Sequence, residues 1–147
     1  MKYFIFFFAL AIGIAALWYS QAFIRLYWKT GKWNKVQAKV LSKEVVLNPR
    51  SNSLRSPYRL QVQYSYHINN KDYTSTKLDL VELMDGFQSY TKPAGEKRLA
   101  EIKEFITVYV NPDEPTQAVA ERAGIFLFVF VFLIGFFSVL IGITKLF

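Results

Sequence analysis

Residues 58–68 read YRLQVQYSYHI, and this stretch decides the fold of the central part of the chain. Apolar or aromatic residues occupy every even position, and polar residues occupy every odd position between them. An alternation with a period of two is typical of a strand with one buried face and one solvent-facing side. Asn69 and Asn70 follow, and asparagine tolerates left-handed backbone angles. We therefore expect a hairpin that continues into a second β-prone run at residues 73–77.

Three further segments carry strand patterns. Apolar residues at 36, 38 and 40 alternate with polar ones, which predicts a strand that continues to about Leu47. Residues 105–110 are rich in β-branched and aromatic residues and are followed by Pro112 and Pro115, which favour a turn. A short strand is expected at residues 117–120. These segments predict a mostly antiparallel sheet.

The segments between the expected strands have different characters. Residues 93–104 contain good helix formers, which predicts one short helix. Residues 48–57 are rich in Asn, Pro, Arg and Ser, which indicates a mobile hairpin loop. Residues 36–121 are therefore expected to form a small β-rich soluble domain, arranged as a sandwich or a barrel-like sheet.

The hydrophobic residues of the chain gather at its two ends. Residues 3–24 and 123–144 are each 22 positions long without a charge, and together they hold 11 of the 14 Phe. A helix of that length reaches about 33 Å, which suits a hydrocarbon core of about 30 Å. We predict an α+β membrane protein with two transmembrane helices, at 1–24 and 122–145, flanking the β domain, and a basic aromatic segment at 25–35.

The first apolar stretch has an alternative interpretation as a cleaved signal peptide. Small residues near Ser20 and Ala22 resemble a cleavage site. Trp18 and Tyr19 are bulky for such a site, however, and several cations follow as they would after a stop-transfer segment. A retained helix is the favoured interpretation.

Two spans would place both termini on the same side of the membrane. Six cations and no acid lie between Arg25 and Lys43, and by the positive-inside rule this bias favours a cytoplasmic central domain. The rule loses force for loops longer than about 60 residues, and this loop is longer. We expect a two-span protein of the inner cell membrane, and the charge bias favours a cytoplasmic position for its central domain.

Small residues recur at a spacing of four in both apolar stretches. They are Ala9 with Gly13 and Ser138 with Gly142. Such pairs let helix backbones approach closely, either between the two spans or between copies of the chain in a homo-oligomer. No charged residue lies inside either stretch, which argues against an ion or proton pathway.

Composition excludes several kinds of chemistry. The chain has no Cys and a single His, so a disulfide framework, a thiolate nucleophile and a multi-histidine metal site are excluded. His67 falls on the expected solvent-facing side of its strand, and Asp79, Glu82 and Asp85 lack the spacing of a calcium loop. No glycine-rich phosphate loop is present. We predict a non-enzymatic protein without catalytic residues, cofactor or metal.

The strongest charge feature follows the first apolar stretch. Its expected contacts with anionic lipid head groups are Arg25, Lys29, Lys32 and Lys35. Cations near a negative membrane surface contribute on the order of 1 kcal/mol each, and Tyr27, Trp28 and Trp33 suit the interface. Basic patches with aromatic residues also bind nucleic acid. Nucleic acid is not favoured here, because the patch lies within a few residues of the expected bilayer.

The order of several motifs resembles a known family. The residues that carry the resemblance are Trp33, Val36, Ala38, Val40, Tyr64, Tyr66, Tyr73, Val108, Tyr109, Asn111, Pro112, Pro115 and Ala118. Together they resemble the bacterial domain of unknown function 3592 family, over nearly the whole chain. The resemblance implies a β-rich domain between two membrane helices and assigns no activity.

Two classes of function fit these patterns. The first is a membrane-anchored binding module that contacts an unknown membrane or envelope protein, through an exposed strand edge or through Arg50, Ser53 and Arg55 of the 48–57 loop. A narrower form is an immunity-type protein that blocks a toxin at the membrane. The alternative is a lipid- or small-ligand-sensing domain with a pocket lined by tyrosines 64, 66, 73 and 109.

Overall fold

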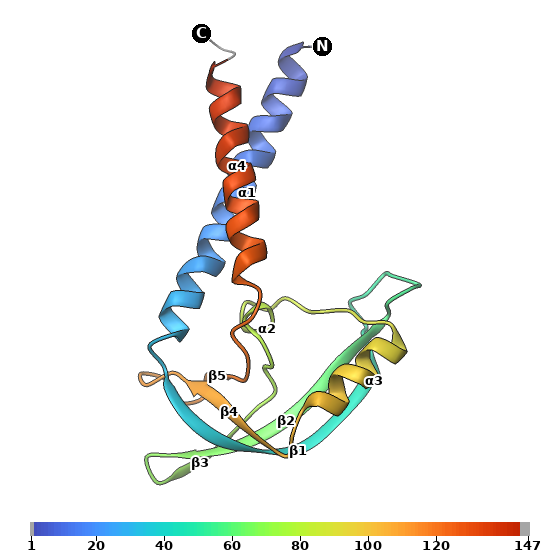
Figure 1. Cartoon of the computed structure of the whole chain (residues 1–147), viewed down its shortest axis with the longest axis vertical. Coiled ribbons are helices and arrows are strands. Elements are labelled where there is room, and N and C mark those ends of the chain that lie inside the picture. Colours follow the sequence, from blue (N-terminus) through green and yellow to red (C-terminus); the bar gives the residue numbers. More distant parts are fainter. Residues whose placement is uncertain (1, 145–147) are drawn as a thin grey trace. The chain divides into compact units, whose positions relative to one another are not determined.

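A computed structural model describes residues 2–144, which form two compact units. One unit comprises the described residues up to 29 and from 124 onward, and the other comprises residues 30–123. The elements follow one another as α1, β1, β2, β3, α2, α3, β4, β5 and α4, as Figure 1 shows. The chain is therefore an α+β protein in which a β-rich unit is inserted between two long helices.

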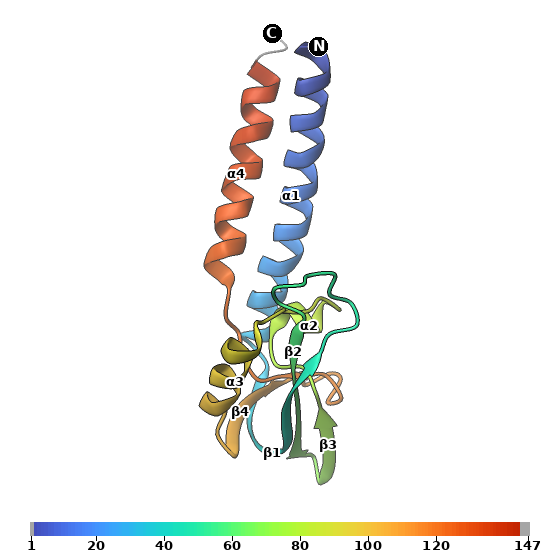
Figure 2. The same ribbon diagram turned by 90° about the vertical axis from the view of Figure 1, so that its right-hand side faces the viewer.

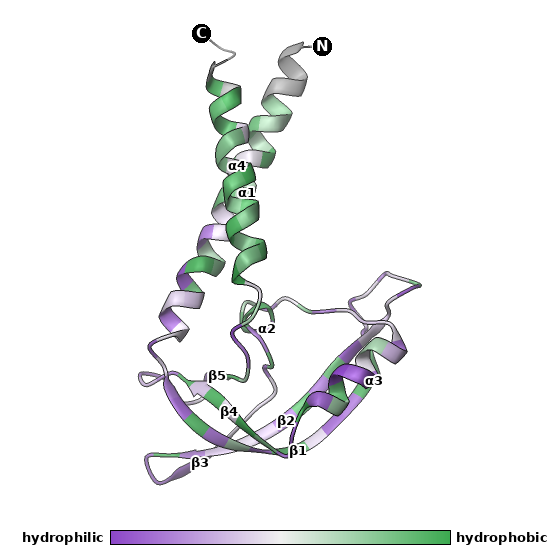
Figure 3. Cartoon of the chain, viewed as in Figure 1, coloured by the Kyte–Doolittle hydropathy of each residue, from purple (hydrophilic) through white to green (hydrophobic). Residues whose placement is uncertain are grey.

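The helical unit consists of α1 (Lys2–Thr30) and α4 (Ile125–Thr144), which lie side by side in both views of Figures 1 and 2. The hydropathy colours of Figure 3 mark both as mainly hydrophobic. Among the described residues, Phe7–Thr30 is the one helical segment long and apolar enough to cross a membrane; Ile125–Ile141 is apolar but shorter. The first helix extends six residues beyond the expected end at 24, through Thr30.

A pair of glycines brings the two helices together. A Cβ added at Gly135 would lie 3.0 Å from the carbonyl oxygen of Gly13, so only glycine permits this approach. Phe23 stacks on Phe128 with ring centroids 3.5 Å apart. Gly13 was expected at such a contact, but its main partner is Gly135. Ser138 lies nearby, Ala9 is exposed, and Gly142 lies outside the residues whose side chains are described.

Five antiparallel strands form one sheet in the order β3-β2-β1-β4-β5. Their bounds are Asn34–Leu47 for β1, Tyr58–Ile68 for β2, Lys71–Ser75 for β3, Phe105–Val110 for β4 and Ala118–Val119 for β5. The long strand β1 pairs with β4 through its first half and with β2 through most of its length. Its register against β2 shifts between Val40 and Ser42, which marks a bulge at the exposed Leu41. The alternation at residues 58–68 is confirmed as β2.

The two ends of the sheet are joined by the segments that follow its outer strands. The amide of Glu121 donates a hydrogen bond of 2.7 Å to the Leu78 carbonyl, and that of Ala120 donates one of 3.4 Å to the Lys77 carbonyl. The expected sandwich is wrong, because the described strands make a single sheet. The chain beyond the two-residue β5 turns back to the segment after β3, and these two hydrogen bonds join the ends of the sheet.

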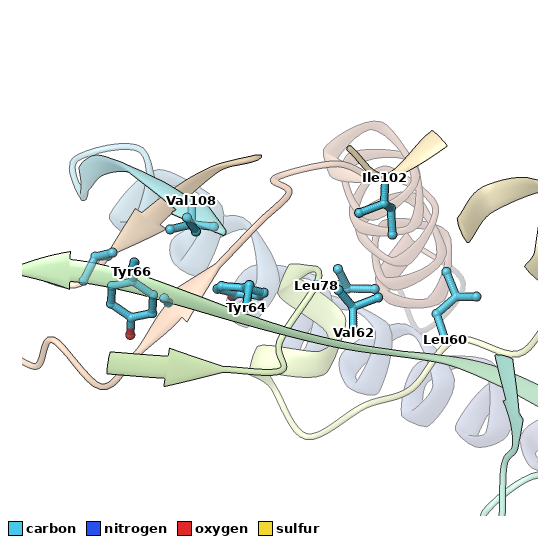
Figure 4. Packing of buried hydrophobic residues seen from close by; sticks show 10 residues of the cluster. Leu60, Val62, Tyr64, Tyr66, Leu78, Ile102 and Val108 are labelled. Carbon is cyan, nitrogen blue, oxygen red and sulfur yellow. The ribbon is translucent and has the colours of Figure 1, made fainter. Parts of the chain in front are cut away.

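The core lies on the inward face of the sheet. Figure 4 shows Leu60, Val62, Tyr64 and Tyr66 of β2 pointing to this side, with Val108 of β4 beside them. The alternating polar residues Arg59, Gln61 and Gln63 are exposed. The Tyr64 hydroxyl donates a hydrogen bond of 2.7 Å to the Lys77 carbonyl, and the Tyr66 hydroxyl donates one of 2.6 Å to the Pro115 carbonyl. The phenol groups thus reach polar partners although their rings are buried.

Two helices, rather than the one expected, belong to the β-rich unit. The short α2 (Leu80–Leu83) begins after Asp79, whose side chain accepts a hydrogen bond of 2.9 Å from the Glu82 amide. The predicted helix at 93–104 forms as α3 (Lys92–Glu101). A four-residue helix is too short to show a periodic pattern in the sequence, so the missed α2 is explained by its length.

Two contacts attach α3 to the sheet: Gly95 of the helix packs against β1, and Lys43 of β1 bonds to the end of the helix. A Cβ added at Gly95 would lie 3.2 Å from Val45 Cγ1, so α3 packs closely against β1 there. The Lys43 ammonium donates hydrogen bonds to the carbonyls of Leu99 (3.1 Å) and Ile102 (2.7 Å) at the end of α3. A cation at a helix C-terminus complements the unpaired carbonyls. Lys43 therefore has a structural role in this unit.

Candidate functional site

The loop between β1 and β2 is ordered by its own hydrogen bonds. The Asn48 amide donates to the Pro57 carbonyl (2.6 Å), and the Ser51 amide donates to the Asn48 carbonyl (3.0 Å). Ser51 Oγ donates to the Ser56 carbonyl (3.2 Å), and the Ser56 amide donates to Ser53 Oγ (3.1 Å). The segment expected to be a mobile hairpin loop therefore has a defined internal structure built from serine and asparagine side chains.

This loop presents exposed side chains of two kinds. Leu54 is 100% exposed, and the predicted contact residues Arg50, Ser53 and Arg55 are all exposed as well. No Asp or Glu occurs between residues 45 and 71, so the surface formed by the loop is basic with one large apolar side chain. We call residues Arg50, Ser53, Leu54 and Arg55 the loop surface. Such a surface can contact an acidic partner that offers an apolar depression.

A cavity of about 460 Å³ lies beside the base of this loop. Its walls come from four segments: the start of the β1–β2 loop, the beginning of β2, the chain after β3, and α2 with the turn that follows. The lining residues are Asn48, Pro49, Arg50, Arg59, Leu60, Gln61, Thr76, Lys77, Glu82, Asp85, Gly86 and Phe87. Three cations and two carboxylates are among them. We call this the loop-base cavity.

Several polar groups of the loop-base cavity are held by partners within the chain. The Lys77 ammonium donates to the Glu82 carbonyl (2.9 Å) and lies 3.7 Å from an Asp85 carboxylate oxygen. Arg50 Nη1 donates to the Asp85 carbonyl (3.3 Å). Glu82 Oε2 accepts from the Leu78 amide (2.7 Å). These contacts connect the loop to α2 and hold in place the wall of the cavity that α2 and the following turn form.

Burial governs the ionisation of Glu82. Loss of solvent raises the pKa of its carboxyl above the ordinary value, and the nearby Asp79 carboxylate raises it further. The Leu78 amide and the Lys77 and Arg59 charges act in the opposite direction without cancelling the effect of burial. The cavity therefore contains one acid that holds its proton more strongly than an exposed glutamate does.

The four cations expected to contact lipid are distributed over both units. Arg25 and Lys29 lie one turn apart on α1, and both are exposed. Lys32 and Lys35 are exposed in the β-rich unit, where the Lys35 ammonium lies 5.9 Å from the centre of the Tyr109 ring. Lipid contact by these residues stays a prediction.

The tyrosines expected to line a ligand pocket are used in other ways. Tyr64 and Tyr66 are buried in the core, and Tyr73 stacks on Tyr66 with ring centroids 5.9 Å apart. The Tyr109 ring has the Arg122 guanidinium 5.3 Å from its centre. None of the four lines the loop-base cavity or the second cavity described next.

The second cavity, of about 270 Å³, lies between α3, β4 and the end of the β-rich unit. It includes Arg98, whose guanidinium donates to the carboxylates of Glu101 (2.9 Å) and Glu121. The hydrogen bond from Glu101 and the charge of Glu121 raise the pKa of Arg98, which keeps this cation charged. Since Arg98, Glu101 and Glu121 already pair with one another, these three charges have a structural explanation.

The remaining sequence candidates also have local partners. His67 Nδ1–H donates to Asp72 Oδ1 (2.7 Å) across β2 and β3, in solvent. Asp79, Glu82 and Asp85 serve the cap of α2 and the contact with Lys77. Among the described residues there is no group of three or more side chains able to hold a metal ion.

Asn48, Arg59 and the rest of the loop-base cavity were not singled out from the sequence. They come from segments up to 39 positions apart, and no local spacing connects them. The one sequence signal that could have drawn attention to them is the run from 45 to 71, which contains four cations and no acid. That signal indicates a basic surface but not a cavity.

Comparison with known proteins supplies the family. No curated protein is significantly similar to the chain. The family model described as Domain of unknown function (DUF3592) matches residues 36–124, from β1 to the residue before α4. The match covers more than half of the chain and includes the loop-base cavity. The chain belongs to the DUF3592 family.

Proposed function

We propose that this chain is a non-enzymatic, membrane-anchored binding module that recognises a partner protein through the loop surface. The observation that carries this proposal is the complete exposure of Leu54 on a loop already ordered by its own hydrogen bonds. A large apolar side chain in solvent gains free energy when a partner covers it. A preorganised loop loses little conformational entropy on binding. The two features together favour recognition.

Charge defines the kind of partner. Arg50 and Arg55 flank Leu54, and the nearest acids in the sequence are Glu44 and Asp72. An acidic protein surface with an apolar depression complements this arrangement, because opposite potentials accelerate association and the apolar contact slows dissociation. The partner is proposed to be a membrane or envelope protein with such a surface.

The anchor is proposed to be the helical unit. α1 has the length and composition to span a bilayer, and α4 is apolar along Ile125–Ile141. The helices run in opposite directions, as Figures 1 and 2 show, so two spans would place both termini on the same side. We propose that both helices cross the inner cell membrane and that the β-rich unit faces the cytoplasm, as the basic segment favours.

Cross-linking in native membranes tests partner binding. The chain has no cysteine, so Ser53→Cys supplies the only thiol for a cross-linker beside Leu54. We expect one discrete adduct, which is lost when Leu54→Asp or the pair Arg50→Glu and Arg55→Glu is added. Lys71→Cys, exposed at the β2–β3 turn, is the matched control and should give no adduct. An adduct that survives both sets of changes would contradict the proposal.

The same thiol tests the topology. A membrane-impermeant maleimide should label Ser53→Cys only after cells are broken, if the β-rich unit is cytoplasmic. Labelling in intact cells would place the unit outside the cytoplasm and direct the search for a partner to the envelope.

A further inference from the structure

Asn48, which lines the loop-base cavity, has a buried side-chain donor without a partner among the described residues. Asn48 is 5% exposed, and its Oδ1 accepts a hydrogen bond of 3.1 Å from the Arg50 amide. This bond fixes which end of the side-chain amide is the oxygen. The Nδ2 end has no hydrogen-bond partner among the described residues. Buried polar groups in folded proteins are nearly always paired, so an acceptor from outside the chain is expected here.

Positive charge lies in the same cavity. Arg59 is exposed at the start of β2, and its guanidinium makes no hydrogen bond or ion pair with other described residues, although its charge acts on the Glu82 carboxyl. Arg50 uses Nη1 for the Asp85 carbonyl, and its guanidinium has further donors. The two carboxylates of the cavity oppose this charge only in part, because Asp85 lies beside the Lys77 ammonium and Glu82 accepts from the Leu78 amide. The cavity therefore offers donors and positive charge in excess.

We propose that the loop-base cavity binds a small ligand through an anionic group, a carboxylate or a phosphate, that accepts a hydrogen bond from Asn48 Nδ2 and pairs with the Arg59 guanidinium. Charge-assisted hydrogen bonds of this kind are short and strong, and arginine suits both anions because its donors form a planar fork. The volume of about 460 Å³ lies in the range of small-molecule sites. Leu60 and Phe87 supply apolar contacts for the rest of the ligand.

This site shares Arg50 with the proposed partner surface and differs from it in its other residues. Asn48 and Arg59 carry the ligand proposal, whereas Leu54 and Arg55 carry the partner proposal and do not line the cavity. Changes at one pair of residues can therefore be tested without changing the other. The anion itself has two sources, a soluble metabolite or a lipid head group, which share the recognition chemistry and differ in where they are found.

Nuclear magnetic resonance of the full chain in lipid nanodiscs tests the proposal directly. The chain is labelled with ¹⁵N at asparagine, and Asn48→Asp identifies the side-chain resonances of Asn48. That variant keeps an oxygen that can accept the hydrogen bond from the Arg50 amide. In phosphatidylcholine discs the chain is titrated with inorganic phosphate and with succinate, and in a second arm the discs contain phosphatidylglycerol instead.

We expect the Asn48 NH₂ resonances to move in a saturable way in at least one arm. A response to phosphate or succinate identifies a soluble ligand, and a response confined to phosphatidylglycerol discs identifies a lipid head group. Arg59→Gln should weaken the response about tenfold, which corresponds to one charge-assisted hydrogen bond. Lys71→Gln, which removes an exposed cation outside the cavity, should bind as the unchanged chain does. The proposal is overturned if the resonances stay fixed in every arm, or if Arg59→Gln responds no differently from Lys71→Gln.

Discussion

Arg122 Nε donates a hydrogen bond of 3.1 Å to the Thr30 hydroxyl, joining residues 92 positions apart. Thr30 is fully buried, and the Arg122 guanidinium also lies 5.3 Å from the centre of the Tyr109 ring. Thr30, the first residue of the β-rich unit, and Arg122, next to its last residue, are therefore connected through their side chains. The unit is bounded at both ends by the same contact.

The Thr30 and Arg122 side chains should be coupled energetically. In a double-mutant cycle with Thr30→Val and Arg122→Gln, we expect a coupling free energy of unfolding of about 1 kcal/mol, typical of a buried hydrogen bond. Denaturant unfolding of the full chain in detergent measures it. Lys35→Gln, near the same aromatic ring but not bonded to Thr30, provides the control cycle. Strictly additive effects in the first cycle would show that the bond contributes nothing.

The Tyr64 hydroxyl should contribute to stability and the Tyr73 hydroxyl should not. Tyr64→Phe removes the hydrogen bond to the Lys77 carbonyl, and we expect the free energy of unfolding to fall by about 1 kcal/mol. Tyr73→Phe deletes the same atom from a half-buried ring whose hydroxyl makes no described hydrogen bond, so little change is expected. Thermal unfolding of both variants side by side gives the comparison. Equal effects would mean that the Lys77 contact is not important.

The Tyr64 phenol should also resist ionisation. Burial raises the pKa of Tyr64 above its ordinary value, with smaller contributions from Tyr66 and Glu82. In an ultraviolet titration, Tyr64 should therefore ionise only when the protein unfolds at alkaline pH. The difference spectrum between the unchanged chain and Tyr64→Phe isolates this group. A phenolate signal from Tyr64 in the folded protein would contradict the prediction.

Glu82 should make stability fall as pH rises. Its pKa in the folded protein is raised above the ordinary 4.5, mainly by burial, so the folded state holds the proton more strongly than the unfolded state. The free energy of unfolding therefore decreases with pH from about 4.5 until the raised pKa is passed, and stays lower above it. Glu82→Gln keeps an oxygen for the Leu78 amide and should remove this decrease.

Denaturant midpoints of both proteins across this pH range provide the measurement. Glu96→Gln, an exposed glutamate on α3, is the control and should leave the pH profile unchanged. A Glu82→Gln profile parallel to that of the unchanged chain would show that Glu82 titrates normally.

Regular alternation made β2 and its core residues predictable. Leu60, Val62 and Tyr64 point inward because every second side chain of a strand faces the same side, and a solvent-facing polar residue separates each pair. Proline after residue 110 likewise fixed the end of β4. The helices α1 and α4 followed from uninterrupted apolar composition, although the end of α1 at Thr30 depends on polar residues that composition does not distinguish from a loop.

The loop-base cavity could not be predicted, because its residues share no local pattern. Asn48 is buried through a backbone bond to Pro57, and Glu82 reaches the cavity only because Asp79 starts a helix of four residues. Closure of the sheet could not be predicted either. The contact from Glu121 to Leu78 joins backbone groups, which every residue other than proline carries, so no residue type marks it in the sequence. Side-chain patterns predict faces of elements well but not the contacts between distant turns.

The Gly135 contact should be essential for pairing of the two helices. Phe23→Cys with Phe128→Cys places one thiol on each helix, at the two positions whose rings stack 3.5 Å apart, in a chain without other cysteines. A short bifunctional thiol reagent should cross-link the two cysteines within one chain in membranes. Adding Gly135→Leu should reduce the yield of this cross-link severalfold, because the side chain would meet the Gly13 backbone. Ile134→Leu, at a half-exposed neighbouring position, should leave the yield unchanged, and equal yields for the two variants would contradict the prediction.

The junction at the β5 end of the sheet also shortens the strand edge that is open to other molecules. Rows of unpaired amides and carbonyls on outer strands can recruit strands from other molecules, which leads to aggregation. Here the last strand is only two residues long, and the chain beyond it bonds to Lys77 and Leu78 after β3. The edge that β5 offers to a neighbouring sheet is therefore only two residues long. A second copy of the protein can therefore form few strand-to-strand hydrogen bonds at β5.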